Sequence, residues 1–236
     1  MRILILGGHG FIGSHTSNLL KEKGHTIGVV DCYHQYFTFP DQEYFSILKL
    51  RKDHANNDKT FIGKIEDESF MSRVFEEFKP DIVMHLATYP NAKMVARNVA
   101  DATTNMVTAT ASILNLCVKS NVKRIVFASS SMAYGEFNGG IPDENVMCNP
   151  NTLYGSYKHQ GERMCQIWKR EHGLEYVIMR PSALYGTRDM VTRVISQMTK
   201  SALTRNQITV QGPENRLDFS NVTDVADAFA RAATID

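Results

Sequence analysis

The sequence lacks the features that mark several classes of protein. Its 236 residues include only four cysteines and one tryptophan, and no run of about 18 apolar residues could cross a membrane as a helix. The 26 basic residues nearly balance the 25 acidic ones, so no strong field favours nucleic acid or a membrane surface. We therefore expect no nucleic-acid partner and no membrane association.

The few cysteines also argue against a disulfide scaffold or a metal centre. Cys32, Cys117, Cys148 and Cys165 are scattered and show no C-x-x-C spacing. They predict reduced thiols in a cytoplasmic protein without a bound metal. A strand pattern that begins at Arg2 leaves no room for a signal peptide, which favours the same location.

The sequence does contain a regular alternation of strand and helix patterns. Near-continuous apolar strands at 3–6 and 125–127 are typical of a parallel sheet covered on both faces. We predict an α/β fold, with a Rossmann-like doubly wound parallel sheet in residues 1–180. Residues 181–236 are expected to form a small, shortened substrate lobe, whose last helix could pack back on the first domain. The expected strands are 2–6, 26–30, 60–63, 81–86, 124–128, 175–179 and 208–210, and the expected helices are 11–23, 41–50, 67–78, 100–119, 153–171, 191–202 and one from 223.

Three glycines and an acid form the first candidate site. Gly7, Gly10 and Gly13 lie between the first strand and the first helix, the spacing of a phosphate-binding turn. Glycine triplets also occur in ordinary turns, but Asp31 ends the second strand, where a carboxylate binds the adenosine ribose hydroxyls. A carboxylate there repels a ribose phosphate, so the pattern predicts NAD rather than NADP.

A tyrosine and a lysine form the second candidate site. Tyr154 and Lys158 are four residues apart, on one face of an expected helix. A nearby ammonium group lowers the pKa of a phenol, which would suit Tyr154 for acid/base work. The alternative is an ordinary surface tyrosine and a solvated lysine. The serines at 129–131 favour the site, because ligands bind beyond the carboxyl ends of parallel strands.

Together these segments resemble the extended short-chain dehydrogenase/reductase family, also called the NAD-dependent epimerase/dehydratase family. The resemblance implies NAD as cofactor, a nucleotide-linked sugar as substrate and a homodimer, in which the two long helices at 100–119 and 153–171 would pair with their copies. The matching segments, in the family's order, are residues 7–13, Asp31, 85–87, Asn105, 129–135, 150–158, 180–186 and 216–219.

The resemblance also implies residue roles. Tyr154 would be the general acid/base, Lys158 would hold the nicotinamide ribose and tune Tyr154, and Ser130 would bond the reacting sugar hydroxyl. Ser131 would also contact substrate, and Arg216 would contact a nucleotide diphosphate through its guanidinium. The implied cofactor-binding residues are Gly7, Gly10, Phe11, Ile12, Gly13, Asp31, Leu86, Ala87, Asn105, Tyr154 and Lys158.

Three departures from the family pattern narrow the hypothesis. Met132 stands where members that dehydrate sugars carry an acid, which favours epimerisation or simple oxidation and reduction. Lys64 replaces an aspartate that contacts adenine in many members, and Ala183 replaces an asparagine near the diphosphate. Our hypothesis is an NAD-dependent epimerase of a nucleotide-linked sugar. The alternatives are an NAD(P)-dependent reductase of a keto-sugar or another carbonyl, and a non-enzymatic NAD-binding regulator.

Other conspicuous residues are assigned to structure rather than to chemistry. His9 is expected to fill a variable position of the turn, and His85 to be structural, since neither has a metal-like cluster of partners. The aromatic run at 33–39 is expected to pack locally within its loop rather than against an adenine.

Overall fold

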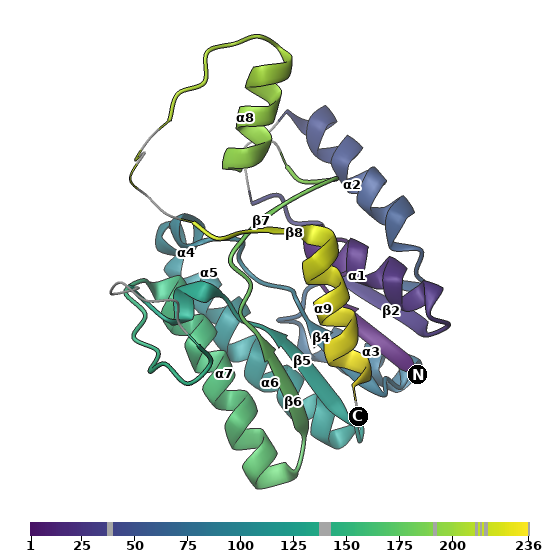
Figure 1. Ribbon diagram of the computed structural model, residues 1–236. Coiled ribbons are helices and arrows are strands. Elements are labelled where there is room, and N and C mark those ends of the chain that lie inside the picture. The colour runs from purple at the N-terminus through teal and green to yellow at the C-terminus, as the bar shows by residue number, and fades with distance from the viewer. Residues whose placement is uncertain are drawn as a thin grey trace.

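The centre of the computed structural model is a six-stranded parallel sheet with the order β3-β2-β1-β4-β5-β6 (Figure 1). The order reverses between β1 and β4, as in a dinucleotide-binding doubly wound sheet, so the predicted fold class is confirmed. The structure describes residues 1–36, 40–136, 143–190, 193–210, 212, 214 and 217–235. The strands are β1 (Arg2–Leu6), β2 (Thr26–Asp31), β3 (Lys59–Ile62), β4 (Ile82–His85), β5 (Arg124–Ala128) and β6 (Glu175–Met179).

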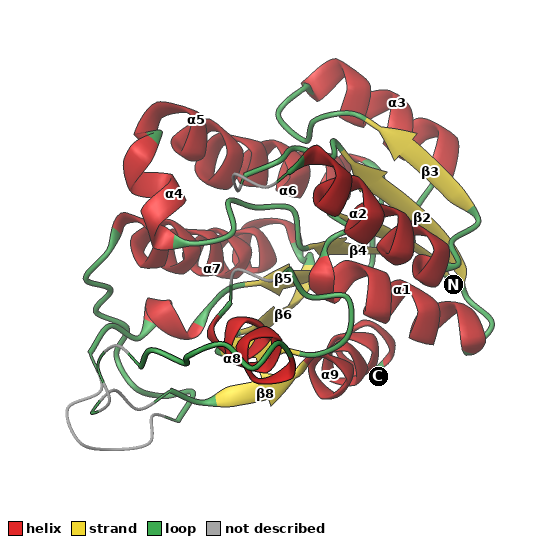
Figure 2. Cartoon of the chain, turned by 90° about the horizontal axis from the view of Figure 1, so that it is seen from above, coloured by secondary structure: helices red, strands yellow, loops and turns green. Residues whose placement is uncertain are grey.

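Both faces of the sheet are covered by helices (Figure 2). Side chains alternate along β1, so Ile3 and Ile5 pack towards α1 and α9, whereas Leu4 and Leu6 pack towards α3 and α6. All four side chains are fully buried, which explains the unbroken apolar run in the sequence. The α-helices of the described residues are α1 (Phe11–Glu22), α2 (Asp41–Ala55), α3 (Glu68–Phe78), α4 (Ala92–Arg97), α5 (Val99–Thr103), α6 (Ala109–Lys119), α7 (Leu153–His172), α8 (Val194–Leu203) and α9 (Val222–Thr234).

The second sheet differs from the expectation. Ile208 and Val210, predicted to lie in a strand, are exposed and belong to no strand. Within the described part of the chain, these two apolar residues have no neighbouring strand to bury them. Instead β7 (Ala183–Tyr185) and β8 (Phe219–Asn221), which the sequence reading missed, pair in parallel as a separate two-stranded sheet.

The long helix expected at 100–119 is divided. Its first part is α5, its last part is α6, and between them lies a π-helical turn over Thr104–Thr108. A π turn contains one extra residue per turn and is frequent at functional sites. This turn carries Asn105, whose side chain faces the pocket described below.

The last helix packs on the sheet domain. Phe229 and Ala230 of α9 are fully buried in the cluster that contains Ile3 and Ile5. In the sequence, the segment 181–221 is therefore flanked by β6 and α9, which contribute to the same core. Helix α8 lies away from the helices that cover the sheet (Figure 1). The domain boundary at residue 180 stays a prediction. Among the helices in the described residues, none is long and apolar enough to cross a membrane.

Candidate active site

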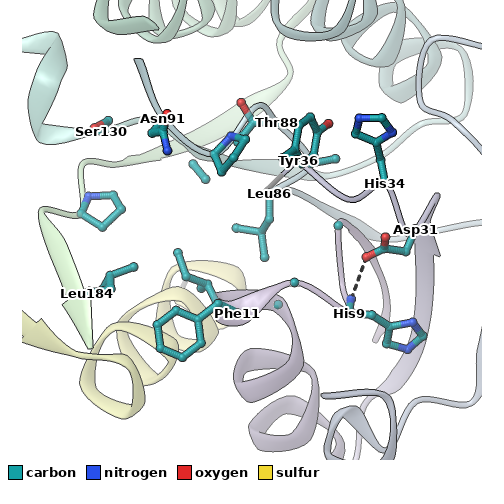
Figure 3. Close-up of a pocket in the computed structure, with 18 of the residues that line it drawn as sticks. His9, Phe11, Asp31, His34, Tyr36, Leu86, Thr88, Asn91, Ser130 and Leu184 are labelled. Carbon is teal, nitrogen blue, oxygen red and sulfur yellow. Dashed lines mark hydrogen bonds between the residues drawn. The ribbon is translucent and has the colours of Figure 1, made fainter. Parts of the chain in front are cut away.

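A pocket of about 500 Å³ lies at the carboxyl ends of the sheet strands. Asp31 and His9 lie at one end of the view in Figure 3, and Ser130 and Leu184 lie at the other. Arg216 lies outside the described residues, as do Phe37 and Phe39. The other predicted site residues all line the pocket, namely Gly7, Gly10, Phe11, Ile12, Gly13, Asp31, Leu86, Ala87, Asn105, Ser130, Ser131, Tyr154 and Lys158.

The glycine turn is closely packed at its two ends. Gly7 has φ +78°, and a Cβ atom there would lie 2.8 Å from the backbone nitrogen of Ala87. A Cβ atom on Gly13 would lie 2.4 Å from the Gly7 carbonyl oxygen. No side chain can be added at either position without moving the turn, so the glycines hold β1, α1 and the segment after β4 together.

The N-terminus of α1 is open to a ligand. Gly10 is its cap residue and provides no side-chain acceptor, and the first turn contains no acidic residue. The first N–H groups of a helix have no partner within the helix and carry a partial positive charge. Phe11 and Ile12 therefore present backbone donors that suit a phosphate group.

Asp31 is held by two backbone groups. The N–H of His9 donates to its Oδ2 atom (3.1 Å), and the N–H of Tyr33 donates to its Oδ1 atom (2.9 Å; Figure 3 shows the first bond). His9 does more than fill the turn. Its buried ring is hydrogen-bonded to the Tyr33 hydroxyl (3.1 Å) and to Asn57 Oδ1 (3.0 Å), so it ties the turn to the segments on both sides of α2.

Asn105 lines the pocket and has one unused hydrogen-bond acceptor. Its Nδ2 atom donates to Glu66 Oε1 (2.9 Å), whereas its Oδ1 atom is buried and has no hydrogen-bond partner among the described residues. Glu66, which the sequence reading missed, also lines the pocket, two residues after Lys64. A buried carbonyl oxygen without a partner is costly, which favours a ligand that donates to it.

Tyr154, Ser130 and Lys158 converge on the pocket. Tyr154 lies in the first turn of α7, which Thr152 caps by accepting a hydrogen bond from the Gly155 N–H (3.1 Å). Burial raises the pKa of Tyr154, while a hydrogen bond with Ser130 acts in the opposite direction. The expected lowering of this pKa by an ammonium group is therefore not found in the chain alone.

Lys158 explains that difference. Its Nζ atom lies 5.9 Å from the centroid of the Tyr154 ring and donates to the Ala128 carbonyl oxygen (2.6 Å). Burial lowers the pKa of Lys158 to about 7, so a large fraction of it is uncharged at neutral pH. The side chain lines the pocket, as predicted. Its protonated form is disfavoured by burial, because no carboxylate of the described residues forms an ion pair with it.

A buried acid lies one turn beyond Lys158 on α7. Glu162, which the sequence reading missed, accepts hydrogen bonds from Ser129 and from Arg180. Its four-residue spacing from Lys158 repeats that between Tyr154 and Lys158, and this is the signal that could have revealed it. Cys148 and His159 also approach Glu162, but Arg180 occupies both carboxylate oxygens, which opposes binding of a metal cation there.

Comparisons with known proteins agree with this geometry. The model of the NAD dependent epimerase/dehydratase family matches residues 3–235. The UDP-glucose 4-epimerase of Lactobacillus helveticus is 27% identical over 98% of this chain and 72% of its own length. The crystal structure of UDP-glucose 4-epimerase from Thermotoga maritima with UDP-glucose has a TM-score of 0.84 at 29% identity and covers 97% of this chain and 72% of that one. The Thermus thermophilus UDP-glucose 4-epimerase in complex with NAD has a TM-score of 0.83 at 25% identity, over 99% and 74%.

The fold and the matches define an enzyme class, that of NAD-dependent sugar-nucleotide epimerases and dehydratases. The chain belongs to the NAD-dependent epimerase/dehydratase family, as its motifs predict. Its pocket fits the family's cofactor, because the uncapped start of α1 suits a diphosphate and the anchored Asp31 carboxylate suits ribose hydroxyls.

Proposed function

We propose that this chain is an NAD-dependent epimerase that inverts a hydroxyl-bearing carbon of a nucleotide-linked sugar. The observation that carries the proposal is the convergence of Ser130, Tyr154 and Lys158 on the pocket that also receives the glycine turn and Asp31. Acid/base groups and cofactor-binding groups thus face one space. Such an arrangement supports removal of a proton and a hydride from the same carbon.

Proton transfer is the task of the chain's own residues. Tyr154 takes the proton of the sugar hydroxyl and later returns it, while Ser130 hydrogen-bonds that hydroxyl. Lys158 stands one turn along α7 and would contact the nicotinamide ribose. NAD, when bound, supplies the hydride acceptor and donor, held by the glycine turn and Asp31.

The wall beside Ser130 favours epimerisation over dehydration. Met132 lines the pocket two residues after Ser130. Loss of water from a sugar needs a group there that can exchange a proton, and a thioether cannot. The chain supplies an acid/base residue in Tyr154 but no acid at position 132.

The test is interconversion of UDP-glucose and UDP-galactose, followed by NMR with catalytic NAD and no other redox reagent. Tyr154→Phe should lower turnover by about 10²- to 10⁴-fold while NAD binding is unchanged. Tyr157→Phe is the matched control, because that hydroxyl bonds Thr103 Oγ1 (2.8 Å). No epimer from UDP-glucose, together with stoichiometric NADH consumption in a separate assay with a nucleotide-linked keto-sugar, would identify a reductase instead. Full activity of Tyr154→Phe would remove Tyr154 from the mechanism.

The homodimer is also a proposal. Trp168 Nε1 donates to Asn115 Oδ1 (3.3 Å), which joins α7 to α6 and would give a second copy one continuous two-helix surface. Light scattering at micromolar concentration should give twice the chain mass.

A further inference from the structure

Arg51 is a buried cation that the proposed chemistry leaves unused. It lies on α2, is only 6% exposed and lines the pocket. Its Nε atom donates to the Arg188 carbonyl oxygen (2.9 Å), and this is its only hydrogen bond among the described residues. The two terminal nitrogens of the guanidinium therefore retain their donors. Burial lowers the pKa of Arg51 to about 10, which shows how poorly the protein alone compensates this charge.

A second arginine approaches the same point. The Cζ atom of Arg51 lies 5.4 Å from the centroid of the Phe11 ring, and that of Arg193 lies 5.6 Å from it. Phe11 is the first residue of α1, so both cations lie near the open N-terminus of that helix. The two arginines come from α2 and from the residue before α8, elements that are 138 residues apart in the chain at their nearest (Ala55 to Arg193).

Only one of the two arginines has an ion-pair partner among the described residues. Asp189 Oδ1 lies 3.4 Å from Arg193 Nε, and its side chain is 3% exposed. Asp31 acts on Arg51 only at longer range, and among the described residues no carboxylate forms an ion pair with Arg51. An anionic ligand between the arginines and the start of α1 would supply the missing negative charge.

We propose that Arg51 and Arg193 bind the diphosphate of the dinucleotide cofactor together with the first turn of α1. A guanidinium can donate two parallel hydrogen bonds to phosphate oxygens, so two arginines suit a group with two phosphates. A nucleotide sugar also carries a diphosphate. The position of both arginines at Phe11, beside the glycine turn, favours the cofactor. Arg193 also acts on Tyr154, whose pKa burial raises and the Arg193 charge lowers in smaller part. The inference rests on NAD binding and is independent of which reaction follows.

The test compares ligands that differ in their phosphates. Isothermal titration with NAD, ADP, adenosine and UDP is performed on the wild type and on Arg51→Gln. The variant should bind NAD and ADP about 10- to 100-fold more weakly and adenosine within about twofold of the wild type. Lys49→Gln is the matched control: it removes the same charge from an exposed residue of α2 and should leave all four affinities unchanged.

Several outcomes would overturn the proposal. Unchanged ADP binding by Arg51→Gln, or an equal loss of adenosine binding, would give Arg51 a structural role. Loss of UDP binding with intact ADP binding would assign the arginines to the sugar nucleotide. If Arg51→Gln does not fold, Arg193→Gln decides by the same comparison, because that side chain is 37% exposed. No turnover is measured, so failure of the proposed epimerase activity would leave this result intact.

Discussion

The Arg180 guanidinium donates two hydrogen bonds to the Glu162 carboxylate, from Nε to Oε1 at 2.8 Å and from Nη2 to Oε2 at 2.7 Å. The Glu162 side chain is 1% exposed, and Arg180 also stacks on the Tyr134 ring at 4.6 Å. Ser129 donates to the same carboxylate. The pair thus fastens α7 to the ends of β5 and β6, beside Lys158.

Glu162→Gln should cost about 3–5 kcal/mol of unfolding free energy, because it leaves a largely buried guanidinium without its counter-charge. Glu171→Gln, an exposed position on the same helix, should cost less than about 1 kcal/mol. Urea denaturation measures both. Burial alone would raise the pKa of Glu162, but the bonds from Arg180 and Ser129 outweigh it and lower the pKa. The extra unfolding free energy of the wild type over Glu162→Gln should therefore be fully present above pH 4.5 and should decrease as the pH falls further. Equal losses in the two variants would contradict this account.

Lys158→Met should stabilise the ligand-free chain at neutral pH, by on the order of 3 kcal/mol after loss of the bond to Ala128. Burial lowers the pKa of Lys158 to about 7 from an ordinary value of 10.5. Between these values the unfolded chain binds a proton that the folded chain refuses, so wild-type stability rises with pH. The difference between variant and wild type should shrink from pH 7 to 10.5 in urea titrations at several pH values. A difference independent of pH would show that Lys158 keeps its ordinary pKa.

Gly7→Ala should weaken NAD binding and destabilise the fold, whereas Gly24→Ala should only destabilise it slightly. Both glycines have a positive φ, +78° and +82°, so both substitutions carry backbone strain of about 1 kcal/mol. A Cβ atom on Gly24 would meet nothing within 4 Å, but one on Gly7 would strike the backbone of Ala87. Thermal unfolding and NAD titration separate the two effects. Equal behaviour would mean that the close approach to Ala87 is unimportant.

Asp31→Asn should relax the choice between cofactors. The carboxylate is fixed by the N–H groups of His9 and Tyr33, and an amide keeps one acceptor oxygen but no charge. We expect NAD to bind about tenfold more weakly and the ratio of NADP to NAD affinity to rise, since repulsion of a ribose phosphate is removed. Asp53→Asn, exposed on α2, serves as the control. An unchanged ratio would mean that shape rather than charge excludes NADP.

Local patterns were enough to predict the sheet. The strands Arg124–Ala128 and Glu175–Met179 have the bounds that the sequence predicts, because each has four apolar or aromatic residues in a row after a charged one. The β7–β8 pair was missed because its three-residue strands pair across more than thirty residues, and such short segments have no recognisable period.

The sequence predicts those parts of the candidate site whose residues are separated by fixed intervals along the chain. The glycine turn and the Tyr154–Lys158 pair follow fixed intervals, whereas Arg51 reaches the pocket only through the packing of α2. The expected helix ends at residue 50, one position before Arg51. The polar residues that follow show no apolar helical pattern, although the helix continues to Ala55. The pKa of Lys158 could not be predicted either, because it depends on burial in the folded chain and not on the spacing of residues.

The burial of α9 in the first core has a consequence for the order in which the chain acquires its structure. A ribosome makes the six sheet strands first, yet the face that carries Ile3, Ile5 and Ile27 is covered only in part, by α1, until Phe229 and its neighbours leave the exit tunnel. One face of the nascent sheet therefore stays partly exposed throughout the synthesis of residues 180–221. During that interval it is a natural client for chaperones, and a stop codon placed before residue 222 should yield an insoluble product rather than a smaller working domain.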